Sequence, residues 1–280
     1  MRMFELISGQ VTAAVGSGGN SITFYPVTMI DTDSLTIRPF DDALGHCEIF
    51  HVFGTLRTSS QVGIINIKKQ KNDLDVVNGN YFPFHLISDR SGQYANARIP
   101  VEQMETLTVK LMNKNFPQNE ITIFQAIIHY TDLTGFSSTF ITANELERRR
   151  VRKVNVLWDT INSVNGGTYE NQTAINTLVK GLLPKKKYAI LGVHHQINSS
   201  TYLTSVSFRS PEWGNIRVGQ PIGIESGIND SWFYHQSRIS GLPMIPVFTG
   251  EIAERCILET MSTGSNSNNA TFTVHLVELA

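Results

Sequence analysis

Short segments in which apolar and polar residues alternate recur along this chain. In 124–130 every even-numbered residue is apolar, whereas Gln125 and His129 between them are polar. Successive side chains of a strand point to opposite faces, so a period of two predicts a strand with one buried face. The same alternation is found in 107–112 and 271–279. The pattern therefore predicts an all-β protein, with the polar residues on the outer faces of its sheets.

The second half of the chain divides into about eight such segments separated by turn-rich connections. They are 175–180, 188–197, 203–209, 216–225, 232–239, 245–249, 255–261 and 271–279. The first half supports a similar division, from 35–40 to 121–131, although 81–99 is harder to divide. Eight short strands are typical of a jelly roll, and an immunoglobulin-like sandwich with one strand fewer is the alternative.

The two halves also match each other in sequence order. Residues 47–68 align with 188–209 without a gap, which places Ile49 on Ile190. Further matches follow in the same order, namely 99–101 with 245–247, 107–112 with 256–261 and 128–129 with 274–275. Ordered self-similarity is the sequence signature of a repeated fold. We therefore expect two tandem eight-stranded jelly-roll sandwiches, residues 1–138 and 166–280, joined by a linker at 139–165 that contains a short helix.

The linker begins with a helix signal. Thr142 and Glu145 have the spacing of a capping box, in which the hydroxyl and the carboxylate each accept from a backbone N–H at the start of a helix. This predicts a helix over 143–153. Val151 and Val154 fit its apolar face, but 154–158 fits a strand equally well, so the structure beyond 153 stays open.

The same segment carries the densest charge in the chain. The basic residues are Arg148, Arg149, Arg150, Arg152 and Lys153. A cluster of this kind can bind phosphate, either in lipid head groups or in a nucleic acid. More commonly a short run of charge is a solvated helix face that pairs with nearby acids or with a neighbouring subunit.

Composition narrows the class of protein further. Of 280 residues 41% are hydrophobic and 17% are charged, so a folded core is expected. The 23 basic and 24 acidic residues nearly balance, so we do not expect the whole surface to bind nucleic acid. Two cysteines, Cys47 and Cys256, exclude a disulfide-stapled scaffold, and we expect buried, unreactive thiols. Glu5 interrupts the first apolar stretch, which predicts no signal peptide, no membrane span and synthesis in a cytoplasm.

No pattern indicates catalysis, a metal or a cofactor. His194 and His195 are adjacent, so a strand would direct them to opposite faces. The alignment of the halves predicts that His129 and His275 repeat on the outer face of the last strand of each half. The glycine-rich run 16–20 lacks the Lys-Ser/Thr and the helix of a phosphate loop. We therefore expect no enzyme. A sugar ring can stack on exposed aromatic side chains, and the candidates for such a platform are Trp213, Trp232 and Tyr234. Residues of this kind more often fill cores.

The duplicated segments 47–68 and 188–209, with the Ile-Pro-Val sequences at 99–101 and 245–247, resemble the double-jelly-roll major capsid proteins of tailless icosahedral viruses, the lineage of adenovirus hexon. The resemblance covers nearly the whole chain and is architectural, without a diagnostic motif. It implies a structural virion protein whose homotrimers form pseudo-hexagonal capsomers and contact neighbouring capsomers and other capsid proteins. It also implies that the basic linker is a candidate contact to an internal membrane or the genome.

Two other classes of function compete with this one. A phage spike or tail protein would bind a receptor, such as a carbohydrate, through exposed aromatic side chains at Trp213, Trp232 and Tyr234. A tandem-sandwich enzyme, such as a copper monooxygenase or an amidase, would need a metal or acid site that the sequence does not reveal. Assembly state separates the first two classes, and bound metal would indicate the third.

Overall fold

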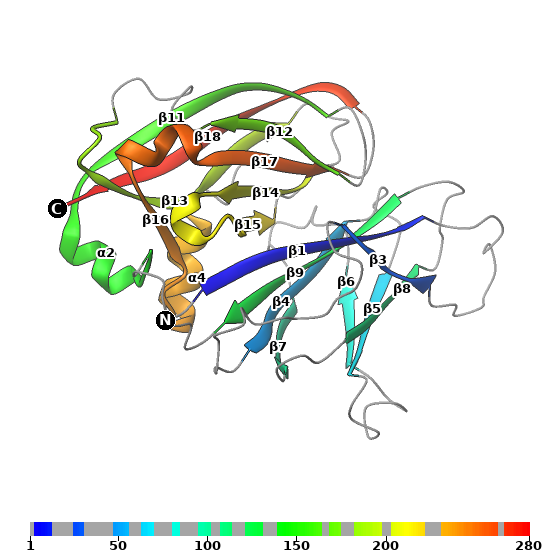
Figure 1. The fold of residues 1–280 in the computed structure, drawn as a ribbon. Coiled ribbons are helices and arrows are strands. Elements are labelled where there is room, and N and C mark those ends of the chain that lie inside the picture. The colour runs from blue at the N-terminus through cyan, green and yellow to red at the C-terminus, as the bar shows by residue number, and fades with distance from the viewer. Residues whose placement is uncertain are drawn as a thin grey trace.

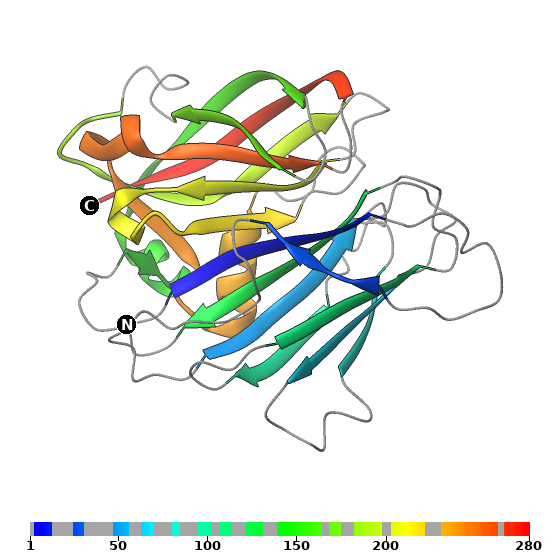
Figure 2. The same cartoon turned by 45° about the vertical axis from the view of Figure 1, so that its right-hand side comes forward.

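The structure, a computed structural model, describes most of the chain. The described residues are 3–12, 25–30, 47–55, 63–69, 80–84, 95–101, 107–113, 121–130, 139–163, 168–174, 182–197, 203–221, 231–262 and 266–280. Within them the protein is mainly β, with antiparallel sheets and few helices, as the alternating pattern predicts. Figures 1 and 2 show two groups of strands, β1–β9 and β10–β18, which we call the first and second strand sets.

The first strand set forms two antiparallel sheets. Its strands are β1 Met3–Thr12, β2 Tyr25–Pro26, β3 Thr28–Met29, β4 Cys47–Thr55, β5 Gly63–Lys69, β6 Asn80–Phe84, β7 Ala95–Val101, β8 Leu107–Asn113 and β9 Ile121–Tyr130. The order of pairing is β3-β1-β9-β4-β7 in one sheet and β2-β8-β5-β6 in the other.

The second strand set also forms two antiparallel sheets. Its elements are β10 Phe140–Ile141, α2 Ala143–Arg149, β11 Arg150–Ser163, β12 Tyr169–Ala174, β13 Lys187–Ile197, β14 Leu203–Arg209, η1 Pro211–Trp213, β15 Arg217–Pro221, α4 Trp232–Ser240, β16 Ile245–Thr249, η2 Gly250–Arg255, β17 Ile257–Ser262 and β18 Asn266–Leu279. Its sheets have the orders β10-β16-β13-β18-β11 and β12-β17-β14-β15.

The strands pair in the same order in both sets. The short strands β3 and β10 each extend a sheet at its edge, and without them each set has eight strands among the described residues. Numbered one to eight along the chain, these strands pair as 1-8-3-6 and 2-7-4-5 in both sets. We refer to the two kinds of sheet by these orders.

A bulge marks the same place in the third strand of each set. The pairing of β4 with β9 shifts between Ile49 and His51, and that of β13 with β18 shifts between Ile190 and Gly192. The extra residues are Phe50 and Leu191, which the gap-free sequence alignment also places together. A β-bulge bends a strand and redirects a side chain, so its shared position is a specific point of likeness.

The register corrects the sequence alignment of the last strands. Ile49 pairs with Ile128 and Ile190 pairs with Leu276, so Ile128 corresponds to Leu276 and not, as predicted, to Val274. The sequence could not detect this difference, because a shift of two residues leaves every side chain on the same face of the strand. As a consequence, the predicted repeat of His129 at position 275 is wrong.

Two predicted elements differ from the structure. The helix expected over 143–153 ends at Arg149, and Arg150 begins β11, which pairs along its length with β18. The strand expected at 232–239 is the helix α4, whose buried residues Trp232, Phe233, Gln236 and Ser237 have the spacing of one helix face. The predicted strands at 35–40 and 175–180 lie outside the described residues.

The two strand sets pack directly against each other. Figures 1 and 2 show β1 lying beside β15, and buried side chains of both sets form one hydrophobic cluster. Gln125 and His129, which the sequence places on an outer polar face, are buried at this contact, so that expectation is wrong. Within the described residues, no helix is both long and apolar enough to cross a membrane.

Candidate functional site

The basic segment follows a short capped helix. The N–H of Glu145 donates to Thr142 Oγ1 over 3.2 Å, and the N–H of Thr142 donates to Glu145 Oε2 over 2.8 Å. These two bonds confirm the predicted capping box. Because α2 ends at Arg149 and β11 is the last strand in the order of its sheet, the basic residues continue onto a sheet edge.

Two of the five basic residues form ion pairs that hold them in place. Arg150 Nη1 lies 3.1 Å from Glu147 Oε2, and Arg152 Nε lies 2.6 Å from Glu278 Oε2. The hydrogen bond with Glu278, which is nearly buried, raises the pKa of Arg152 and keeps its guanidinium charged. Lys186 Nζ lies 4.0 Å from the other oxygen of Glu278.

The other three basic residues extend the positive charge. Arg148 and Lys153 are exposed, and Arg149 is half-buried. Among the ion pairs found in the described part of the chain, none involves these three side chains. Charged side chains on an edge strand also oppose open-ended pairing with further strands.

A pocket of about 460 Å³ lies between α2, α4 and β11. Its apolar lining includes Leu146, Leu191 and Val277, from α2, β13 and β18. Its charged and polar lining includes the predicted residues Arg150, Arg152, Lys153 and Tyr234, together with Glu147. We call this feature the basic pocket. It combines cations with apolar surface and can accept a group that carries both negative charge and an apolar part.

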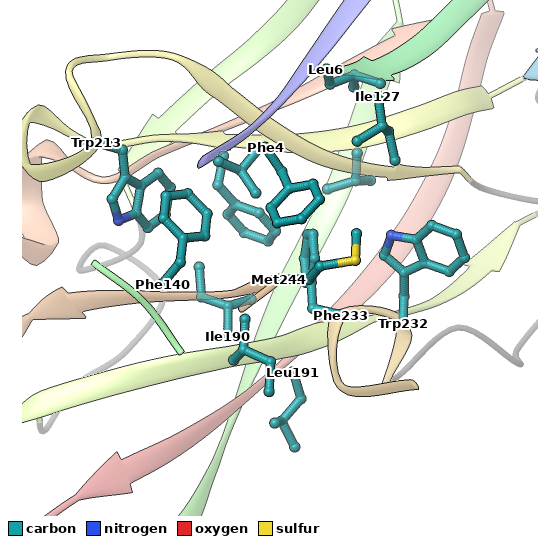
Figure 3. Packing of buried hydrophobic residues seen from close by; sticks show 14 of the residues in the cluster. Phe4, Leu6, Ile127, Phe140, Ile190, Leu191, Trp213, Trp232, Phe233 and Met244 are labelled. Atoms are coloured by element: carbon teal, nitrogen blue, oxygen red, sulfur yellow. The ribbon is translucent and has the colours of Figure 1, made fainter. Parts of the chain in front are cut away.

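The structure separates the three aromatic residues of the receptor-binding hypothesis. Tyr234 lines the basic pocket and donates from its hydroxyl to Glu147 Oε1 over 3.1 Å. Trp213 is fully buried and donates from Nε1 to the carbonyl of Val247 over 2.8 Å, whereas Trp232 is buried beside the ring of His51. Figure 3 shows both indoles within the core. Neither tryptophan offers a ring face to a sugar, so these residues do not form the expected platform.

A polar cluster that the sequence did not predict lies between the strand sets. Gln125 Nε2 donates to Ser8 Oγ and to Ser205 Oγ, each over 2.8 Å, and Ser8 Oγ lies 2.5 Å from the hydroxyl of Tyr169. These residues come from β1, β9, β12 and β14. Buried polar groups that are hydrogen-bonded in this way fix the alignment of the surfaces that carry them.

Charged residues continue this cluster. The carboxylate of Glu259, which is fully buried, accepts from Arg209 and from Arg217 Nε, the latter over 2.7 Å. The guanidinium of Arg217 also lies 3.7 Å from the centre of the Tyr169 ring. Burial raises the pKa of Glu5, although a hydrogen bond from Tyr130 and the charge of Arg217 act in the opposite direction. No pattern in the sequence indicates this cluster, because its members come from strands far apart in the chain.

Two buried histidines, His51 and His129, and Cys256 take structural positions. His129 Nδ1 lies 3.0 Å from Glu48 Oε1 and its ring stacks on Phe4, while His51 Nε2 lies 3.0 Å from Gln236 Oε1. No group of three or more His, Cys, Asp or Glu that can hold a metal occurs among the described residues. Cys256 is buried as predicted, and burial raises the pKa of its thiol.

Comparison with known proteins assigns no family to the chain. No family model matches it, and no curated protein matches it. Among solved structures, the crystal structure of the PBSX exported protein XepA is similar at 8% identity, over 99% of this chain and 86% of that chain, with a TM-score of 0.21. A TM-score this low carries no argument about fold or function.

Proposed function

We propose that the chain is a major capsid protein built from two tandem jelly rolls, three copies of which form a pseudo-hexagonal capsomer. The observation that carries the proposal is the pairing order 1-8-3-6 and 2-7-4-5, which occurs once in each strand set. Eight antiparallel strands in two sheets with Greek-key connections are the architecture of viral capsid jelly rolls. Two such units in one chain supply two similar wedges, so three chains supply six.

The proposed domains follow the strand sets closely. The first jelly roll takes residues 1–138. The helix α2 serves as the linker, and β11 belongs to the second jelly roll because it pairs with β18. The predicted linker at 139–165 is therefore shortened to the residues that precede Arg150.

The proposed partners are other copies of the chain, neighbouring capsomers and other capsid proteins, within a virion whose subunits are made in the host cytoplasm. The role is structural, with no catalytic step and no cofactor. The basic residues Arg148, Arg149, Arg150, Arg152 and Lys153 keep their place in the proposal as a contact surface, either between subunits or with the genome or an internal membrane.

The receptor-binding alternative is less well supported. Lectins also use jelly rolls, so the strand order alone does not separate the two functions. The separation comes from the aromatic residues, because Trp213 and Trp232 are buried and only Tyr234 is partly open. Of these three aromatic residues, a receptor-binding protein could use only Tyr234.

The assembly state of the purified chain tests the proposal. We expect light scattering during gel filtration to give three times the 31.2 kDa of one chain, and negative-stain images to show particles of threefold outline. Monomers with an elongated outline would overturn the proposal. Monomers that bind glycans on an array, with binding lost in Tyr234→Ala, would establish the alternative instead.

A further inference from the structure

Two β-bulges meet at the basic pocket. The pairing of β13 with β18 has its extra residue at Leu191, and the pairing of β11 with β18 has an extra residue at Val151. These strands lie on either side of β18 in the sheet, and both extra residues line the pocket. Because a bulge bends its strand and redirects a side chain, the sheet departs from regular pairing twice at this one place.

Aliphatic side chains form the apolar part of the pocket. Leu146, Leu191 and Val277 line it and are otherwise buried, whereas Val151 lines it with 56% of its surface exposed. The pocket volume of about 460 Å³ is some three times that of a cavity that holds a benzene ring, about 150 Å³. Walls of this kind, with Tyr234 as the aromatic residue of the lining, suit an alkyl chain better than a stack of planar rings.

The polar part of the pocket is positively charged. It contains three cations, Arg150, Arg152 and Lys153, and one acid, Glu147, which pairs with Arg150. Glu278, the partner of Arg152, is only 6% exposed and lies behind it. A guanidinium has five N–H donors and each ion pair uses only part of them. A negatively charged group in the pocket therefore meets two arginines that are held in place, together with Lys153.

The helix α4 adds two hydroxyl groups and a further cation. Ser231 and Tyr234 line the pocket from its N-terminal end. The hydroxyl of Tyr234 donates to Glu147 Oε1 and lies 3.5 Å from Nη1 of Arg238, which is exposed. The positive charge thus continues from β11 across the pocket to α4.

The first strand set shows what this place looks like when protein covers it. The register equates three lining residues of the pocket with residues of the first set, namely Lys153 with Phe4, Leu191 with Phe50 and Val277 with His129. There, Phe4 stacks on His129 and belongs to the hydrophobic cluster that both sets share (Figure 3). In the pocket a lysine stands in place of the ring of Phe4. The open position therefore favours an occupant with negative charge over a second apolar protein surface.

We propose that the basic pocket binds a single-chain amphiphile, with an anionic head group, phosphate or carboxylate, on an alkyl chain. The head group contacts Lys153, Arg150 and Arg152, because arginine pairs with either kind of oxyanion through parallel hydrogen bonds. The alkyl chain lies against Leu191 and Val277. The inference concerns the single chain and does not rest on the proposed capsomer.

Both parts of this ligand are needed to account for the lining. Inorganic phosphate or the backbone of a nucleic acid would use the cations and leave the apolar walls exposed to water. An uncharged alkyl ligand would cover the walls and place no counter-charge beside the cations. Only a molecule that carries both groups satisfies a pocket whose apolar and charged residues lie side by side.

Calorimetric titration of the full chain with octyl phosphate tests the ligand class. We expect saturable binding of one molecule per chain, strengthening about two- to fourfold for each methylene from butyl to octyl phosphate, because each methylene removes apolar area from water. We expect octanoate to bind as well, and the tighter of the two to identify the preferred head group. Octanol and inorganic phosphate are expected to bind at least tenfold more weakly. Equal binding of octanol or of inorganic phosphate would overturn the proposal.

Two pairs of variants test the place of binding. Lys153→Glu reverses a charge of the pocket, and Arg255→Glu reverses an exposed charge that does not line it. Val151→Asn and Ile239→Asn form the matching apolar pair, since Ile239 is 80% exposed outside the pocket. We expect octyl phosphate to bind tenfold or more weakly to Lys153→Glu and at least threefold more weakly to Val151→Asn. Both controls should bind like the unmodified chain, with circular dichroism unchanged in all four. Equal effects within either pair would overturn the assignment to this pocket.

Methyl NMR locates the alkyl chain directly. In protein labelled at leucine and valine methyl groups, nuclear Overhauser effects from octyl phosphate are expected at Leu191 and Val277. Effects confined to leucines or valines outside the pocket would overturn the proposal.

Vesicles separate a pocket ligand from contact with a membrane surface. Binding to vesicles of phosphatidylglycerol, with no binding of octyl phosphate, would mean that the basic residues meet a charged surface, and the pocket assignment would be wrong. Binding of octyl phosphate in solution without any vesicle supports the proposal. A chain that binds octyl phosphate as a monomer would keep this inference while overturning the proposed capsomer.

Discussion

Glu5 is an acid that the fold places at the junction of the strand sets. Tyr130 donates to its Oε2 over 2.6 Å, and Arg217 lies on the opposite side of the contact. Loss of water is nevertheless the largest influence, and it raises the pKa of Glu5 above the ordinary value of 4.5. The charged form of Glu5 therefore lowers the free energy of unfolding, because the unfolded chain solvates it better.

This gives a pH-dependent prediction for Glu5→Gln. A raised pKa means that the folded chain holds the proton more tightly than the unfolded chain, so stability decreases as the pH rises from 4.5 through the folded-state pKa. Glutamine resembles the protonated acid. We expect the variant to melt at a higher temperature than the unmodified chain at pH 8, with the difference shrinking towards pH 4.

The exposed Glu251 supplies the control. Calorimetric melting of Glu251→Gln should follow the unmodified chain at both pH values. If Glu5→Gln were instead less stable at pH 8, the attraction of Arg217 for the carboxylate would outweigh its loss of water.

At this scale the sequence predicts inward-facing residues well and outward-facing residues poorly. Ala126 and Ile128 are buried as their alternation indicates, and so is Cys256. Gln125 and His129 are polar, and period-two reasoning assigns them to solvent. Gln125 donates to Ser205, which lies 80 residues later in the chain, and no local pattern contains that information.

The capping box of α2 is a local sequence signal whose effect on stability can be measured directly. Thr142→Ala removes one side of the capping box and leaves the N–H of Glu145 without its side-chain acceptor. We expect the free energy of unfolding to decrease by about 1 kcal/mol, the usual effect of losing such a cap. Urea denaturation followed by circular dichroism measures this difference.

The exposed Asn144 provides a matched substitution within the same helix. Asn144→Ala removes a polar side chain of similar size without touching the cap, and alanine favours a helix. Equal destabilisation by both substitutions would show that the capping box does not stabilise α2.

The beginning of α2 is readable from the sequence, whereas its end is not. The capping box requires only residues near one another in the chain. Val151 and Val154 fit both a helix face and a strand, and the choice is made by β18, which offers Glu278 and Leu276 as pairing partners. The sequence pattern predicts a strand in place of the helix α4 for a related reason, because the aromatic residues Trp232 and Phe233 also favour strands.

For the whole molecule, the repetition is readable from the sequence and the packing of the two strand sets is not. The alignment of 47–68 with 188–209 puts Phe50 on Leu191, and both are bulge residues. Which sheets meet depends on the fit of their outer faces. This also explains why the basic residues alone did not predict a pocket, since Leu191, Tyr234 and Val277 come from three other elements.

The fit between the strand sets is closest where β15 crosses β1, and this supplies the last prediction. A Cβ at Gly219 would overlap Leu6 Cδ2 and would lie 3.0 Å from the carbonyl oxygen of Val206. Gly219→Ala should therefore lower the free energy of unfolding by about 1–3 kcal/mol, the usual range for overpacking. Leu6→Ala should lower it by about 2–5 kcal/mol through the cavity it leaves.

The double variant distinguishes a true contact between the sets from two independent defects. With Leu6 shortened, the added methyl group gains space on one side, although Val206 still crowds it on the other. We expect the double variant, measured by urea denaturation, to lose less free energy of unfolding than the sum of the two single losses, by about 0.5 kcal/mol or more. Strict additivity would mean that β1 and β15 do not press on each other, and the close packing of the two strand sets at this point would lose its support.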